Sequence, residues 1–426
     1  VRLSQGADFS STSASISGGS IVPCRSRVGK NVNDGRYLNH NYGATVADIN
    51  GDGLSDIVLF YHPDVRIFIA NRTTTGAVSF QSYLYQNISL NGLEDASQFV
   101  AMDFDGDGAA EILDTQTKFL YSWNGSIFIK SSIYIPDTNN DINAGSYTVF
   151  SDANGDGKVD LPHQYGPNTQ ITILYSLYGD TFLREFSYQL AQAENTLAGD
   201  FNGDGSSDRA TLRNDDANVY YSGGNRFVKA VDFSEIRNCE TRSKDEKYTG
   251  AGVVIHNPCR VGVADFNGDG LHDMIISSSH VEEGRPAKIV LFNSHVDLQN
   301  DYNVIETHLI GNIPAHSVGD FNGDGKADVI FANDPDAPEN PDHSTRGISY
   351  STGPVPDLLT RISYPLGNTT EIDYTPSSAW GLTSGTAMPF VTQTVSAITV
   401  KDGRSGEART EYAYRGGKYN FHERKF

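Results

Sequence analysis

One short acidic pattern occurs six times in this chain of 426 residues. Each copy is nine residues long, begins with Asp, carries Gly at positions 4 and 6, and ends with Asp or Glu. The copies, named loops 1 to 6 in chain order, span residues 48–56, 103–111, 152–160, 200–208, 265–273 and 320–328. They begin 48 to 65 residues apart. Such recurrence is typical of repeat architectures, in which each unit packs on its neighbours.

Side chains that carry oxygen stand at positions 1, 3, 5 and 9 of every loop, a spacing at which a loop can surround a calcium ion. The glycines permit the sharp turn that brings these oxygens onto one centre. Position 7 is expected to contribute its backbone carbonyl. We predict about one calcium ion per loop, with the ligands Asp48, Asn50, Asp52, Leu54, Asp56, Asp103, Asp105, Asp107, Ala109, Glu111, Asp152, Asn154, Asp156, Lys158, Asp160, Asp200, Asn202, Asp204, Ser206, Asp208, Asp265, Asn267, Asp269, Leu271, Asp273, Asp320, Asn322, Asp324, Lys326 and Asp328.

The loops differ from EF-hand loops, which need a bidentate Glu at position 12 and a helix on each side. Position 12 holds, in order, Leu59, Asp114, His163, Thr211, Ile276 and Phe331. The last ligand is therefore assigned to the carboxylate at position 9. Apolar residues that favour strands follow the loops, as in residues 57–60. We expect the metal to provide rigidity rather than catalysis, because it commits every carboxylate at a ligand position.

The acidic residues are concentrated in the loops. Five loops carry three carboxylates each and loop 2 carries four, which accounts for nearly all of the formal net charge of -21. A solvated acidic surface or adaptation to salt would also make a chain acidic, but carboxylates at ligand spacing favour calcium. A surface of this sign makes nucleic acid and anionic membranes improbable partners. No run of 18 apolar residues occurs, so no membrane-spanning segment is expected.

A repeat of about 50 residues has room for about four strands of ordinary length. A short apolar segment precedes the loops, as at residues 44–47, and a second strand rich in Tyr or Trp follows most of them, as at residues 119–123. Helical periodicity is absent. We therefore predict an all-β fold, a β-propeller of six four-stranded blades, with room for a seventh blade within residues 1–47.

The repeats divide the chain into three predicted parts: a linker or ring-closing strand over residues 1–30, a propeller over 31–355 and a different β-rich segment over 356–426. The insertion around residues 234–256 and the Pro-rich residues 333–347 are expected to form surface loops. The three cysteines allow at most one disulfide bond, and both a Cys239–Cys259 pair and a fully reduced chain remain open. Many weak calcium loops suit the millimolar calcium outside cells, so a secreted protein is expected. The chain shows no signal peptide and looks like a piece of a longer protein.

The loops and their flanking strands resemble the FG-GAP/VCBS repeats of integrin α-subunit propellers and of many secreted bacterial proteins. Residues 358–376, 388–395 and 412–426 resemble the segment that follows the propeller in the B component of insecticidal Tc toxin complexes. SpvB-like virulence proteins and other Rhs/YD-repeat proteins share this arrangement. The resemblance implies a propeller that docks onto a translocating partner, and a tail that leads into a β-shell around a toxic cargo.

Three functions are compatible with the sequence. The first is a calcium-stabilised propeller of a secreted toxin-like protein, acting as a scaffold that docks a toxin component or a receptor. The alternative is a carbohydrate-binding propeller lectin with glycan partners, and an enzyme on a propeller comes last. The toxin-like tail favours the scaffold, because a lectin that stands alone has no use for it. No HExxH, GxSxG or phosphate-binding glycine motif occurs, so no catalytic residue, no organic cofactor and no enzymatic activity are expected.

Overall fold

The structure is a computed structural model of the chain. It describes residues 8–14, 29–30, 37–38, 42–61, 64–72, 78–85, 99–114, 118–134, 150–164, 171–178, 181–189, 195–213, 216–223, 227–232, 260–277, 286–292, 302–310, 318–332, 346–356, 358–380 and 390–417. The three cysteines, the insertion around residues 234–256 and residues 333–345 lie outside these ranges.

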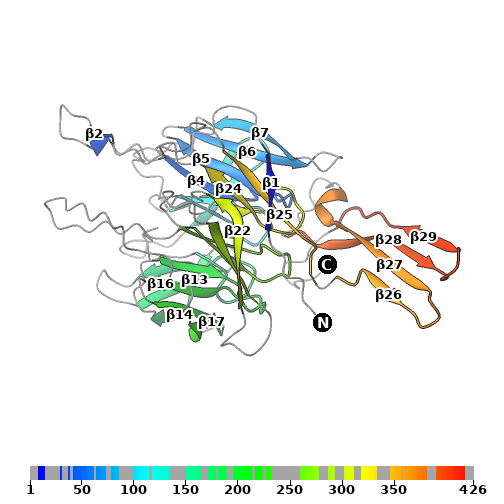
Figure 1. The fold of residues 1–426 in the computed structure, drawn as a ribbon. Helices are drawn as coiled ribbons and strands as arrows, with labels where there is room; N and C mark the ends of the chain where they lie inside the picture. The colour runs from blue at the N-terminus through cyan, green and yellow to red at the C-terminus, as the bar shows by residue number, and fades with distance from the viewer. Residues whose placement is uncertain are drawn as a thin grey trace.

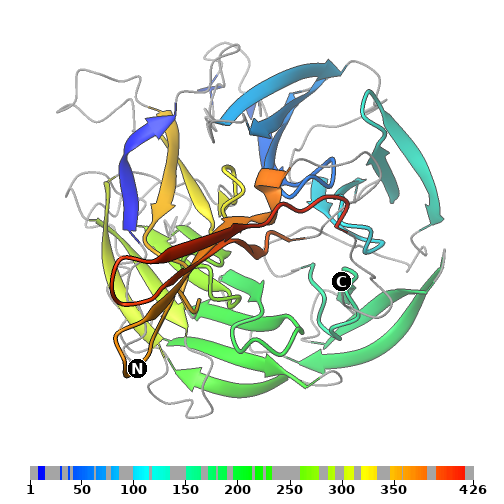
Figure 2. The same cartoon turned by 90° about the vertical axis from the view of Figure 1, so that its right-hand side faces the viewer.

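Six units built from short antiparallel strands stand around a common centre (Figure 2). Units 1, 4 and 5 are four-stranded sheets, and units 2 and 3 are joined at one residue pair, Tyr134 with Thr181. Unit 1 comprises β4 (Tyr42–Ala47), β5 (Asp56–Tyr61), β6 (Asp64–Arg72) and β7 (Val78–Tyr85). Unit 2 comprises β8 (Phe99–Met102), β9 (Glu111–Asp114), β10 (Phe119–Trp123) and β11 (Phe128–Tyr134).

Unit 3 begins with an isolated bridge between Ser151 and Asp160 and continues with β12 (Leu161–Gln164), β13 (Ile171–Tyr178) and β14 (Thr181–Gln189). Unit 4 comprises β15 (Asn195–Gly199), β16 (Asp208–Arg213), β17 (Asp216–Ser222) and β18 (Phe227–Asp232). Unit 5 comprises β19 (Arg260–Ala264), β20 (Asp273–Ser277), β21 (Pro286–Phe292) and β22 (Tyr302–Ile310). In each unit a loop connects the first strand to the second, or the two halves of the bridge, so every loop lies at the same place in its unit.

Unit 6 takes its fourth strand from the other end of the chain. Its strands β23 (Val318–Gly319), β24 (Asp328–Ala332) and β25 (Arg346–Thr352) are followed at the edge by β1 (Asp8–Ala14), which pairs antiparallel with β25. The inner strand β23 contacts β4 of unit 1, and β4 contacts β8 of unit 2. The other described strands before unit 1, β2 (Gly29–Lys30) and β3 (Tyr37–Leu38), pair only with each other.

The apolar core lies between neighbouring units rather than within one of them. One cluster packs Ile57 and Phe68 of unit 1 against Phe321 and Ile348 of unit 6. Four further clusters join units 1 and 2, 2 and 3, 4 and 5, and 5 and 6. Position 2 of every loop is apolar and fully buried, and in loops 1, 2, 4, 5 and 6 it belongs to one of these clusters. Each unit therefore depends on its neighbours for burial, as the repeat predicts.

The C-terminal segment, here called the tail, forms a separate sheet beside the ring (Figure 1). Its strands are β26 (Arg361–Ser363), β27 (Thr369–Pro376), β28 (Gln393–Lys401) and β29 (Glu407–Glu411), with the 3-10 turn η4 (Ser377–Trp380) after β27. This turn is the one helical element among the described residues. The all-β fold expected from the sequence is confirmed.

Candidate metal loops

The Asp at position 1 organises the turn of each loop. In loop 1 the Asp48 carboxylate accepts hydrogen bonds from the amides of Gly51 at 2.7 Å, Asp52 at 3.1 Å and Gly53 at 2.6 Å. The amide at position 6 makes the corresponding bond in all six loops, at 2.6 to 2.9 Å. One carboxylate thus collects successive N–H groups of the same turn.

The glycines at positions 4 and 6 adopt a backbone conformation that other residues rarely reach. Their φ angles lie between 68° and 92° in all six loops. A side chain in this left-handed region costs about 1 to 2 kcal/mol. The loop sequence therefore encodes its own turn, as expected from the spacing of the glycines.

The carboxylate at position 9 ties the loop to the sheet. In loop 1, Asp56 accepts hydrogen bonds from the amide of Ile49 at 2.9 Å and from the amide of Ala70, on the third strand of unit 1, at 2.8 Å. Loops 4, 5 and 6 have the same pair of bonds. All six position-9 side chains are at most 2% exposed. The sequence predicted position 9 to be a metal ligand but did not indicate this link to the sheet, because the third-strand partner lies outside the nine-residue pattern.

Several carboxyl groups of the loops lie in a buried environment that opposes their charge. Burial, followed by the carboxylate at position 5 of the same loop, raises the pKa of Asp48 and of Asp320 to about 7. Burial raises the pKa of Glu111 to about 9, with Asp105 as the next cause. Burial also raises the pKa of Asp328 well above its usual range. A cation among these groups would reverse the repulsion and keep them ionised.

In loop 2 the residues at positions 1, 3 and 9 come together, whereas Asp107 at position 5 is exposed and stands outside this group, and the chemistry of the group fits a hard cation. In loop 2, carboxylate oxygens of Asp103, Asp105 and Glu111 all lie within 4.8 Å of one another. Carboxylate and amide oxygens, with no nitrogen or sulfur ligand, are the donors that calcium prefers. In loops 1, 4, 5 and 6 the side-chain amide of the Asn at position 3 donates to the position-5 carboxylate at 3.0 to 3.3 Å.

The loops are also linked to one another. The amide at position 8 of one loop donates to the carbonyl at position 1 of the preceding loop, at 2.6 to 2.8 Å. The described pairs are Ser55 to Asp320, Ala110 to Asp48, Ser207 to Asp152, His272 to Asp200 and Ala327 to Asp265. They form a continuous chain from loop 3 through loops 4, 5, 6 and 1 to loop 2. The bond from Ser55 to Asp320 joins the two ends of the repeat.

The sequence predicted only a backbone carbonyl ligand at position 7. In the structure the position-7 side chain also packs against the position-4 glycine of the preceding loop. A Cβ added at Gly203 of loop 4 would lie 2.7 Å from the Leu271 side chain of loop 5. Lys326 of loop 6 lies in the same way over Gly268 of loop 5. The glycine at position 4 therefore serves both the turn and this close approach, which the sequence alone could not show.

Two family models match parts of the chain. Residues 307–426 match the family model described as the insecticide toxin TcdB middle/N-terminal region, and residues 43–113 match that of an FG-GAP-like repeat. Both parts of the resemblance predicted from the sequence are thereby confirmed. A search of the curated proteins gives no match.

Several solved structures are similar to the chain. A structure of the Photorhabdus luminescens Tc holotoxin pore matches with a TM-score of 0.59 and 19% identity, covering 91% of this chain and 18% of that chain. A crystal structure of TcdB2-TccC3 matches with a TM-score of 0.48 and 16% identity, over the same shares. A lectin of Agrocybe aegerita that recognises non-reducing terminal N-acetylglucosamine matches with a TM-score of 0.42 and 17% identity, covering 69% of this chain and 75% of that chain.

The present chain thus spans under a fifth of the Tc chains it matches. At such low identity, the likeness to the Tc pore shows the fold. Among the described residues, no helix is long and apolar enough to cross a membrane.

Proposed function

We propose that this chain is the calcium-stabilised propeller module of a secreted toxin-like protein, and that it acts as a scaffold on which a protein partner docks. The match of residues 307–426 to the TcdB family model carries the proposal. That segment contains loop 6, the strands β23 to β25 and the whole tail, so it joins the ring to the part that distinguishes toxin-like chains from other propellers.

The calcium part of the proposal rests on the interior of the loops. In loops 1, 2 and 6, burial and then neighbouring carboxylates raise the pKa of Asp48, Glu111 and Asp320. Calcium would supply positive charge there. The side chains at positions 1, 3, 5 and 9 would hold it, and the position-9 carboxylate would connect it to the third strand of the unit.

The docking part rests on the rigidity of the ring. Interfacial apolar clusters and the chain of bonds between loops fix the units relative to one another. A rigid scaffold can present exposed connections to a protein partner at little entropic cost. We expect that partner to be another component of a Tc-type toxin complex or a receptor, and we expect no catalytic turnover.

The test is binding of the chain to the pore-forming component of a Tc complex, measured by interferometry with calcium and after its removal. We expect binding in calcium that weakens when the loops are emptied. A chain that binds six calcium ions but does not bind the pore component would refute docking onto that component. A glycan array run in parallel examines the lectin alternative, which calcium-dependent capture of one sugar class would favour.

A further inference from the structure

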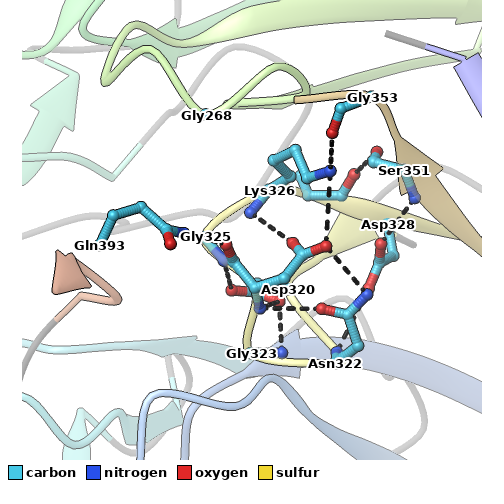
Figure 3. A network of polar contacts seen from close by, with 12 residues as sticks. Gly268, Asp320, Asn322, Gly323, Gly325, Lys326, Asp328, Ser351, Gly353 and Gln393 are labelled. Atoms are coloured by element: carbon cyan, nitrogen blue, oxygen red, sulfur yellow. Dashed lines mark hydrogen bonds and ion pairs between the residues drawn. The ribbon is translucent and has the colours of Figure 1, made fainter. Parts of the chain in front are cut away.

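The tail contacts the ring at the junction between unit 6 and unit 1, where the last repeat meets the first. Loop 6 meets loop 1 there through the bond from Ser55 to Asp320. The turn η4 contacts loop 6 through Ser378, whose hydroxyl donates to the carbonyl of Gly323. The side-chain amide of Gln393, at the start of β28, donates to the carbonyl of Asp324 at 2.7 Å (Figure 3).

These tail contacts are made to the same peptide groups that the position-1 carboxylate holds. The Asp324 amide donates to Asp320 at 3.1 Å, and the carbonyl of that peptide group is the Gly323 oxygen that accepts from Ser378. The Gly325 amide donates to Asp320 at 2.8 Å, and the carbonyl of that peptide group accepts from Gln393. A peptide group is planar, so its two ends turn together. A change at the Asp320 carboxylate must therefore reach the tail through two rigid groups.

Unit 1 takes part in the same junction. Arg72, the last residue of β6, donates through Nη1 to the Gly323 carbonyl at 3.1 Å and to the Ser378 hydroxyl at 2.9 Å. The junction is also close-packed, since a Cβ added at Gly323 would lie 2.5 Å from a Leu54 methyl group. The first unit, the last unit and the tail thus share one carbonyl group.

The connector between the ring and the tail is tied to loop 6 as well. The buried Lys326 at position 7 donates to the carbonyl of Gly353 at 3.0 Å, and its Nζ lies 3.5 Å from the Asp324 carboxylate (Figure 3). Gly353 directly follows β25, where the chain leaves the ring. Both the start of the tail and its later contact segment therefore depend on the conformation of loop 6.

We propose that loop 6 is a latch for the tail: the cation state of loop 6 determines whether η4 and the start of β28 stay docked on the ring. The inference rests on the proposed calcium function. With the cation bound, Asp320 holds both peptide groups in the orientation that Ser378 and Gln393 need. Without it, the repelling carboxylates of loop 6 turn these groups and the tail contacts loosen.

Hydrogen exchange of the whole chain, followed by mass spectrometry, tests the latch. Calcium removal should speed exchange in residues 377–380 and 391–395 by about tenfold or more, as expected for a local opening. Asp320→Ala in loop 6 should do the same in the presence of calcium. The matched control is Asp200→Ala, which removes the position-1 carboxylate of loop 4 and should leave tail exchange within about twofold of the unchanged chain.

A second pair of variants tests the tail side without altering a predicted ligand. The double variant Ser378→Ala, Gln393→Ala should show fast tail exchange even with calcium bound, and calcium removal should add little. Ser363→Ala, at an exposed position of β26, is its control. Equal effects of Asp320→Ala and Asp200→Ala on the tail would overturn the latch.

Native mass spectrometry counts the bound calcium ions. The count distinguishes failure of the proposed calcium function from failure of the latch alone. If no calcium binds, the calcium function itself fails. If calcium binds but tail exchange follows neither its removal nor the Asp320 variant, the latch alone fails.

Discussion

Loops 4 and 6 share the sequence Asp-Phe-Asn-Gly-Asp-Gly and very similar internal hydrogen bonds, yet they face different surroundings. The position-4 amide donates to the position-1 carboxylate at 2.7 Å in loop 4 and 2.6 Å in loop 6. The turn residues Gly203, Asp204 and Gly205 of loop 4 are exposed, whereas Gly323 of loop 6 is buried beneath the tail. The local sequence builds the turn, and the tertiary structure decides what the turn touches.

Because the surroundings of the two loops differ, the backbone carbonyl groups at positions 4 and 5 have different partners. In loop 6 the carbonyls at positions 4 and 5 accept hydrogen bonds from Ser378 and Gln393. In loop 4 the same carbonyls belong to exposed residues. We therefore expect loop 4 to behave as a simple metal loop, and loop 6 to couple its metal to the rest of the chain.

Calcium removal should produce the largest change. A ligand that binds only the folded state at a hundred times its Kd adds about 2.7 kcal/mol per site. Stripping all six loops should therefore lower the melting temperature sharply, as measured by calorimetry. Calcium should leave the chain in two kinetic phases, with the open loop 4 faster than the covered loop 6. A single release rate, unchanged by Asp204→Asn, would remove the distinction between the loops.

Loss of the position-9 carboxylate should come next. Asp328→Ala leaves the amides of Phe321 and Ser351 without their acceptor inside the sheet, which costs about 1 to 3 kcal/mol for each buried group. Asp208→Ala in loop 4 removes the same two bonds, to Phe201 and Ser222. Urea unfolding should give similar losses for both, because the two side chains are fully buried. The exposed Glu407→Gln in the tail should change stability little. A large difference between the two Asp variants would show that the loops differ in their interiors too.

The calcium-free chain should become more stable as the pH falls. The pKa of Asp320 is raised to about 7 in the folded chain, so the folded state binds the proton more tightly than the unfolded state. By linkage this contribution is largest below the unfolded pKa and is lost as the pH rises through about 7. Between about pH 7.5 and pH 5.5 one such group contributes up to about 2 kcal/mol. The melting temperature of calcium-free protein, measured after dialysis at a series of pH values, reports this contribution.

Asp320→Asn should reduce that acid stabilisation. With calcium bound the trend should reverse, since acid then competes with the cation for the carboxylates. Acid destabilisation of the calcium-free chain would contradict the prediction.

Glycine substitutions should show the smallest but most local difference. Gly323→Ala and Gly203→Ala both place a side chain at positive φ, which costs about 1 to 2 kcal/mol in each loop. In loop 6 the added Cβ also meets Ser378 at 2.8 Å, so the tail must move. Gly323→Ala should therefore speed tail exchange, and Gly203→Ala should not. Gly367→Ala, which has a positive φ but no neighbour within 4 Å, controls for backbone strain alone.

The sequence by itself determined the nine-residue turns, their six-fold recurrence and the strands around them. These features follow from local chemistry: glycine supplies positive φ, aspartate collects amides, and the alternation in residues 370–374 predicts the strand found in β27. In loop 2 the carboxylates at positions 1, 3 and 9 meet because they lie within nine residues of one another.

Only the tertiary structure decided which loops touch, and what covers them. The bond from Ser55 to Asp320 joins residues at opposite ends of the repeat, and Arg72 bonds to Gly323 and Ser378, which lie 251 and 306 residues further along the chain. Nothing in a local pattern encodes such contacts, because they depend on how many units fit around the centre. The conformation of each loop is thus determined by its local sequence. The difference between loop 4 and loop 6 arises from the closure of the ring and from the placement of the tail on it.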